Sequence, residues 1–348
     1  MPQHTILLLA LDGKTSTHAN VNAMYGKRPN FFARLATLSC VAVVSAVAQT
    51  SSPATGSLRI GLITAGRANS EAASIERGVM LGAAEAKQTA GLFGGNVELY
   101  DASAGRDAIP GASGLISQRQ IHVLIGASAE DADALSKLAE QRHIIFFNVA
   151  SRAQSLRAAC RRYTFHVEAS EAMYSNAALL GRQAPARSLG GVLSGAADDS
   201  VVLWGSTLER YGASQINDRY RARYRMGMDG AAWAGWAAVK IAAEAALRTK
   251  STDPAKLIEY LESSATSFDG HKGWPLSFRF ADHQLRQPLY VVTPARARAS
   301  AREQLHDVPE LRADGSQENG NAPARLNQML DRLVALPTAP RCPWVRRF

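Results

Sequence analysis

The chain is predicted to be an α/β protein in which a parallel sheet is flanked by helices. Four short apolar runs in its first half alternate with segments whose apolar residues recur at helical spacing. This alternation is typical of parallel strands joined by helices that cover both faces of the sheet. The composition, 46% hydrophobic and 20% charged, is ordinary for a globular protein.

The elements of the first half follow from these patterns in order. The predicted strands are the four apolar runs Leu58–Thr64, Asn96–Tyr100, His122–Ile125 and His143–Asn148. The predicted helices between them cover residues 72–89, 106–119 and 130–141. In the first of these helices, Ile75, Val79 and Ala83 share one face, which we expect to pack on the sheet.

The second half is less regular. Helices are predicted over residues 171–181, in part of 208–225, over 230–247 and after Pro254, which stands at a first helical position behind Asp253. Trp233 and Trp236 lie among small residues in the third of these, so we expect them in the core. Residues 183–200 are rich in Gly, Ala, Ser and Pro and are predicted to form a loop. Leu276, Phe278 and Phe280 alternate as in a strand, with residues 289–292 as the expected partner.

The N-terminal region has the pattern of a secretory signal peptide. Residues 35–48 form an apolar run of 14 residues, whereas a membrane-spanning helix needs about 20. Basic residues precede the run, and Ala46-Val47-Ala48 ends it, so cleavage after Ala48 and export to the periplasm are predicted. The alternative is a buried core helix. Met24 begins a natural signal sequence, and we expect the true start there.

Charge and motifs exclude several classes of function. The net charge is +9, but Lys and Arg are scattered without interleaved aromatic residues, so no nucleic-acid partner is expected. The eight His residues show no metal-binding spacing, and no metal is expected. The nucleophile elbow, the phosphate-binding loop and the dinucleotide fingerprint are absent from the sequence. No cofactor is predicted, and nothing supports an enzyme.

The cysteines leave two alternatives open. Cys40 lies inside the predicted signal peptide and would be removed with it. Cys160 and Cys342 remain, and an exported protein enters an oxidising compartment. Either they form a disulfide or they stay as two unpaired thiols, because a sequence does not show how close their Cα atoms lie.

Hydroxyl groups and free backbone N–H groups at the strand ends are the candidate binding groups. Parallel sheets bind ligands at the carboxyl ends of their strands, here residues 64–67, 101–103, 126–128 and 148–151. Ser128 precedes a predicted helix and Ser151 follows the fourth strand, so each is placed to hold a carboxylate. The alternative is that both are helix caps, which is the commoner role of such serines.

The first half also resembles a known family in sequence. The matching blocks are IGLITAG (60–66), RGVMLGAAEA (77–86), GGNVELYDAS (94–103) and the long segment 123–151. They are similar to type I periplasmic solute-binding proteins of ABC transporters, of the branched-chain amino acid class. Further blocks resemble the subgroup associated with pyrroloquinoline quinone-dependent alcohol dehydrogenases. These are QTAGLFG (88–94), LRAACRR (156–162), ERYGASQINDRY (209–220) and the segment 269–292.

The resemblance implies a type I periplasmic-binding-protein-like fold of two α/β lobes with a truncated second lobe. The strands and helices expected between the first-lobe helix and residue 209 are missing. The implied organisation is an extension plus signal peptide over 1–48 and a first lobe over 49–180. Residues 181–293 then contain the remnant of the second lobe and returning first-lobe elements. A divergent, loosely ordered tail follows over 294–348, apart from a short amphipathic helix near 323–335.

The resemblance further implies the binding residues and the partners. The positions matching the family's ligand-binding motif are Ser128, Ala150 and Ser151, with Thr64, Ala65 and Gly66 lining the mouth. It also favours a Cys160–Cys342 bridge. The implied function is a monomeric periplasmic receptor that binds a small solute without catalysis and delivers it to an ABC permease at the inner membrane. Around the fourth strand, the sequences of the subgroup differ from those of the amino-acid binders. The resemblance therefore does not define the class of ligand.

Two other functions remain as alternatives. The shortened middle and divergent tail are also typical of a truncated remnant, or of an interaction module without transport function. A nicotinamide-dependent α/β enzyme rests on the sheet pattern alone, and export argues against it.

Overall fold

The computed structural model describes residues 56–64, 69–183, 201–293 and 304–307, together with 327–328, 330–331, 333 and 342. All of them belong to one compact unit, Ser51–Phe348. The predicted signal peptide, residues 184–200 of the loop predicted over 183–200, and Ala65 and Gly66 lie outside the described residues. None of the described helices is both long and apolar enough to cross a membrane.

A five-stranded parallel sheet lies at the centre of the described structure. Its strands are β1 (Leu58–Thr64), β2 (Val97–Ser103), β3 (Val123–Gly126), β4 (Ile145–Asn148) and β5 (Thr164–His166), in the order β2-β1-β3-β4-β5. The parallel register brings the carboxyl ends of all five strands to one edge. The four predicted strands are confirmed, whereas β5, with three residues, was not predicted.

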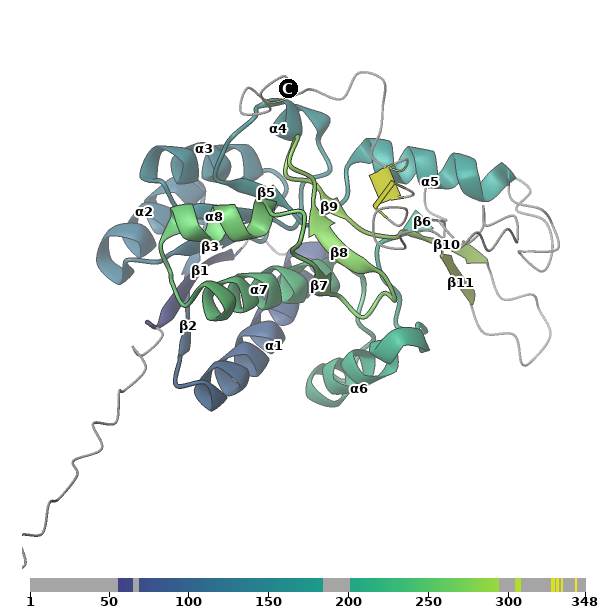
Figure 1. Cartoon of the computed structure of the whole chain (residues 1–348), viewed down its shortest axis with the longest axis horizontal. Coiled ribbons are helices and arrows are strands. Elements are labelled where there is room, and N and C mark those ends of the chain that lie inside the picture. The colour runs from purple at the N-terminus through teal and green to yellow at the C-terminus, as the bar shows by residue number, and fades with distance from the viewer. Residues whose placement is uncertain are drawn as a thin grey trace, which may run out of the picture. The chain divides into compact units, whose positions relative to one another are not determined.

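Helices cover both faces of this sheet, as the sequence predicted (Figure 1). On one face Ile60, Ile125 and Phe147 pack with helices α1 (Ser70–Leu92) and α7 (Gly230–Thr249). On the other face Ile63, Leu124 and Phe146 pack with α2 (Ala108–Arg119) and α3 (Ala132–Arg142). Neighbouring residues of one strand therefore enter opposite cores, which explains why these strands are apolar throughout.

Helices α1 and α7 touch through their backbones. A Cβ atom added at Gly78 would lie 1.9 Å from the carbonyl oxygen of Ala232, and one at Gly235 would lie 2.5 Å from that of Ile75. Glycine is therefore required at both crossing points. Trp233 and Trp236 are buried beside this contact, as predicted for core residues.

The second sheet is small among the described residues. After α4 (Gln154–Ala158), α5 (Glu171–Gln183) leads to an antiparallel sheet of order β11-β10-β6. Its strands β6 (Val201–Val202), β10 (Tyr290–Thr293) and β11 (Gln304–Asp307) have two to four residues each. Strand β11 lies in the segment expected to be a loose tail and was not predicted.

Further elements of the second half complete the described structure. They are the 3-10 turn η2 (Arg210–Gly212), α6 (Ala213–Tyr224), α8 (Pro254–Glu262) and a small sheet of β7 (Phe268–Asp269), β8 (Pro275–Phe278) and β9 (Leu285–Arg286). The predicted pairing of the strand at 276–280 with 289–292 is wrong. A tight turn with His283 at φ 54° places Leu285 opposite Phe278, so β9 is the partner. Residues 290–293 instead join the second sheet as β10.

The tail is tied to the rest of the chain at several points. Cys160 and Cys342 form a disulfide with their Cα atoms 5.2 Å apart. Leu330 and Leu333 are buried in the main core, and Asp331 pairs with Arg286 at 2.7 Å. The described residues from 327 to 333 are helical, within the range where an amphipathic helix was predicted.

Candidate functional site

The candidate site is the edge of the first sheet where β1, β3 and β4 end. Thr64 closes β1 and is half-buried, and its hydroxyl donates a long hydrogen bond of 3.4 Å to the carbonyl oxygen of Ala102 on β2. Ser128 lies in the loop after β3, where its Oγ accepts from the N–H of Glu130 at 3.2 Å. The N-cap of α3 is Asp131, so Ser128 stabilises a turn before the helix rather than the helix itself. Both residues therefore reach the predicted edge.

The loop after β4 is organised by the side chain of Asn148. Its Oδ1 accepts hydrogen bonds from the backbone N–H of Ser151 at 2.9 Å and of Ala150 at 3.4 Å. Its Nδ2 donates to the carbonyl oxygen of Ser151 at 2.8 Å and to Nδ1 of His166 at 3.2 Å. Ala150 and Ser151 stand at the predicted place, but the N–H groups expected to hold a ligand carboxylate already have a partner. The signal for this arrangement is Asn148 itself, since Asn side chains commonly bond the backbone two and three residues on.

Arg157 holds the same loop through hydrogen bonds, and its role was not predicted from the sequence. Its guanidinium is buried and donates to the carbonyl oxygens of Ser151, Ala153 and Glu168 at 2.7–3.1 Å, and to Oε1 of Gln284 at 2.9 Å. Burial lowers the pKa of Arg157 to about 10, so it stays charged at neutral pH. Through these hydrogen bonds Arg157 connects the loop after β4, the segment after β5 and Gln284, the residue before β9.

A second cluster, made of Arg152, Glu168 and Tyr174, stands beside this loop. Arg152 Nε lies 3.4 Å from Oε1 of the buried Glu168, and the guanidinium carbon lies 4.1 Å from the centre of the Tyr174 ring. The Tyr174 hydroxyl donates to the same Glu168 oxygen at 2.8 Å. Burial raises the pKa of Glu168 to about 7, although Arg152 and Tyr174 act to lower it. Sequence reasoning did not find this cluster, because its three members come from separate segments of the chain.

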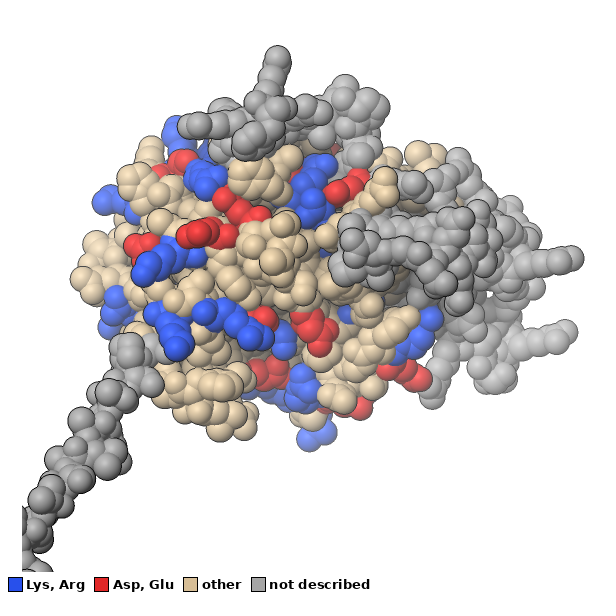
Figure 2. Space-filling model, viewed as in Figure 1, with Lys and Arg blue, Asp and Glu red and all other residues tan. Residues whose placement is uncertain are grey.

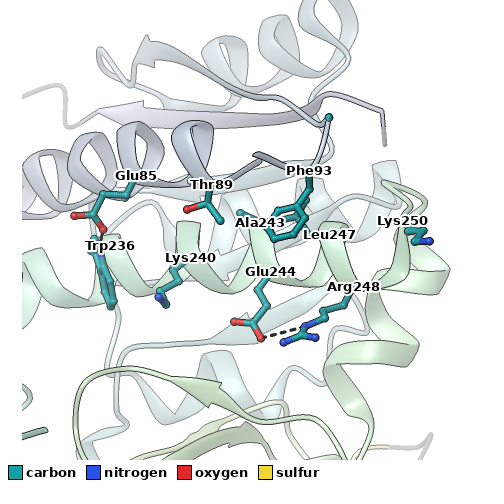
Figure 3. A pocket seen from close by; sticks show the side chains of 13 residues that line it. Glu85, Thr89, Phe93, Trp236, Lys240, Ala243, Glu244, Leu247, Arg248 and Lys250 are labelled. Carbon is teal, nitrogen blue, oxygen red and sulfur yellow. Dashed lines mark hydrogen bonds and ion pairs between the residues drawn. The ribbon is translucent and has the colours of Figure 1, made fainter. Parts of the chain in front are cut away.

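A cavity of about 810 Å³ lies elsewhere, in a groove between the C-terminal halves of α1 and α7 (Figure 3). Glu85 of α1 accepts from Trp236 Nε1 at 2.9 Å and pairs with Arg219. Glu244 pairs with Arg248 at 3.9 Å, and burial raises the pKa of Glu244. Both acids therefore have basic or N–H partners within the protein. None of the predicted binding residues lines this groove.

Charge and metal chemistry add little to these sites. Lys and Arg alternate with Asp and Glu over the described surface in view, without a patch of one sign (Figure 2). Among the described residues, no three His, Cys, Asp or Glu side chains gather in a group that could hold a metal ion.

Comparison with known proteins gives the fold. No protein-family model and no curated protein matches the chain. Among solved structures, an ABC transporter substrate-binding protein from Sphaerobacter thermophilus is similar, with a TM-score of 0.57 at 14% identity. The match covers 72% of this chain and 96% of that one. The chain has a type I periplasmic-binding-protein-like fold.

Two further solved structures carry ligands. The branched-chain amino acid transporter substrate-binding protein of Streptococcus pneumoniae, in complex with isoleucine, matches with a TM-score of 0.54 at 14% identity. A solute-binding protein of an ABC transporter from Rhodopseudomonas palustris, in complex with 3,4-dihydroxybenzoic acid, matches with a TM-score of 0.57 at 11% identity. In each case 72% of this chain aligns with 98–99% of the solved structure. The chain thus follows nearly the whole length of these proteins, and the low identities limit the likeness to the fold.

Proposed function

We propose that the chain is a substrate-binding protein of an ABC importer that binds a small polar solute without catalysis. The observation that carries the proposal is the polar edge formed by Asn148, Ser151, Arg152 and Glu168, at the carboxyl ends of β4 and β5. Ligands of open parallel sheets bind at this edge. In two-lobed receptors, closure around the ligand supplies the second set of contacts.

The proposal includes the place of action and the partner. Residues 24–48 would direct export to the periplasm, where the monomeric receptor would present its ligand to a permease at the inner membrane. The subgroup blocks, such as 269–292, support a link to quinoprotein alcohol catabolism. Fusing residues 24–56 to a reporter that is active only in the periplasm tests export, and a reporter without activity would contradict it.

Isothermal titration of the purified chain tests binding directly. The solutes are branched-chain amino acids, hydroxybenzoates and short-chain alcohols with their acids. We expect saturable heat with at least one class and a rise in melting temperature at saturation, because a ligand that binds only the folded state stabilises it. A folded sample that gives neither signal with any solute would contradict the proposal.

The shortness of the second sheet favours an alternative. A remnant of the family, or an interaction module without transport function, would keep the first lobe and lose the clamp. β6 has only two residues, so the second lobe offers little regular surface among the described residues. Uptake of the identified solute in a strain lacking the receptor distinguishes the two. If an intact paralogue restores uptake and this chain does not, the alternative is preferred.

A further inference from the structure

The groove between α1 and α7 lies away from the candidate site. α1 begins after the carboxyl end of β1 and ends before the amino end of β2, so its C-terminal half lies toward the amino edge of the first sheet. The volume of about 810 Å³ is typical of a small-molecule site. On α7 the lining runs from Trp236 to Lys250, which is about 20 Å of helix. The cavity is therefore elongated, and an extended chain suits it better than a compact ring.

The groove is apolar along its middle and at one end. Its lining comes only from α1, α7 and the residues that directly follow each helix. Ala86 and Ala243 keep the space between the helices free of large side chains, and Leu247 lines it further along. Phe93 is 69% exposed and points from the end of α1 toward α7 (Figure 3). An exposed apolar side chain beside an unfilled groove is typical of a binding surface.

Both acids that line the groove are balanced by groups of the protein itself. Glu85 lies 2.7 Å from Arg219 and also accepts a hydrogen bond from Trp236. Glu244 pairs with Arg248 at 3.9 Å, and burial raises the pKa of Glu244, which disfavours its charged form. Neither acid therefore requires a cationic ligand.

Two lysines line the groove without an acid of their own. In the described part of the chain, no carboxylate lies within ion-pair distance of Lys240 or Lys250. Lys240 lies near Glu244 and Asp269, which share its electrostatic surroundings. Lys250 caps the other end of α7, close to Arg248, and these two cations outweigh the partial negative charge of about one half at the helix C-terminus. A negative head group is therefore expected at the Lys250 end.

We propose that this groove binds the free anion of a long-chain fatty acid. The carboxylate lies at Lys250 and Arg248, where it forms charge-assisted hydrogen bonds. The alkyl chain runs past Leu247 and Ala243 toward Trp236, and each methylene group removed from water strengthens binding by up to about fourfold. The site is independent of the proposed function, since none of the candidate binding residues lines it.

Titration of the full chain with three matched amphiphiles tests the ligand class. Laurate, dodecanol and dodecyltrimethylammonium share one alkyl chain and differ in the charge of the head group. Below the concentration at which micelles form, we expect laurate to bind at one saturable site and dodecanol to bind about 10-fold more weakly, with the cation weaker still. Absence of saturable laurate binding would overturn the site. Equal or tighter binding of the alcohol or the cation would overturn the preference for an anion.

Variants of exposed residues locate the site. Lys250→Glu should lower laurate affinity about 10-fold or more and leave dodecanol affinity unchanged. Phe93→Ala should weaken both ligands several-fold, because it removes apolar contact area. Lys137→Glu is the matched control, since this exposed lysine of α3 undergoes the same charge change away from the groove. Unchanged laurate affinity in both groove variants, or an equal loss in the control, would overturn the assignment.

Discussion

The two sheets of this molecule are held together in different ways. The first sheet is built from one continuous stretch, residues 58–166, and has an apolar core on each face. The second joins β6, β10 and β11, which lie far apart in the chain, and Val201, Tyr290 and Val291 of its strands belong to the same core as one face of the first sheet. The first sheet is thus assembled from neighbouring segments with a core on each face, whereas the second depends on long-range pairing of short strands.

The largest effect is expected from the contact of α1 with α7 against the first sheet. Gly78→Val should cost more than about 3 kcal/mol of unfolding free energy, because its Cβ alone would lie 1.9 Å from a backbone oxygen and the two helices would have to separate. Urea unfolding measures the loss.

The matched control lies in the same helix. Gly91→Ala adds a Cβ with nothing within 4 Å, so it should stabilise the protein by up to about 1 kcal/mol through helix propensity. If the two variants were equally stable, packing of α1 on α7 would not be what supports the first sheet.

Removal of the disulfide tests how much the long-range connection of the tail stabilises the molecule. The Cys160→Ser, Cys342→Ser double variant is expected to lose about 2–4 kcal/mol, since the bond closes a loop that spans much of the chain. Hydrogen exchange should rise most in α5 and β9 and least in β1 and β3, because the described part of the tail bonds to Asn176 of α5 and Arg286 of β9. Reduced wild type serves as the control and should behave like the double variant. Equal exchange rates in oxidised and reduced protein would show that the tail does not stabilise α5 and β9.

The difference between local and long-range contacts also explains which strands could be predicted from the sequence. β1 to β4 were found because each is a local apolar run, long enough to give a pattern. β5 and β6 have three and two residues, and β11 lies in a polar segment, so their pairing depends on distant partners. The partner of β8 was misassigned because one turn at His283 decides it.

In the candidate site, too, local features could be predicted from the sequence and contacts between distant segments could not. Ser128, Ala150 and Ser151 lie at the carboxyl ends of β3 and β4, where the sequence placed them, because strand ends are local features. What those residues do there is decided by Asn148, Arg157 and Arg152, whose contacts cross between segments. A helix cap and a ligand contact use the same side-chain and backbone groups, so a sequence alone does not distinguish them.

The smallest expected effect concerns Glu168, which follows β5 of the first sheet. Its pKa in the folded state is raised to about 7, from an ordinary value near 4.5, chiefly by burial. A raised carboxyl pKa contributes stability that is complete below pH 4.5 and is lost as the pH rises through 7.

Glu168→Gln keeps a neutral acceptor for the Tyr174 hydroxyl and removes this titration. We therefore expect the variant to gain about 2 kcal/mol relative to wild type between pH 5 and pH 8, measured by urea unfolding at each pH. The pKa of the buried His166 is lowered by burial, so its contribution is lost as the pH falls below 6.5. That loss is common to both proteins and cancels in the difference. A difference that stays constant from pH 5 to pH 8 would show that Glu168 keeps an ordinary pKa, and that its carboxyl group is open to water rather than buried.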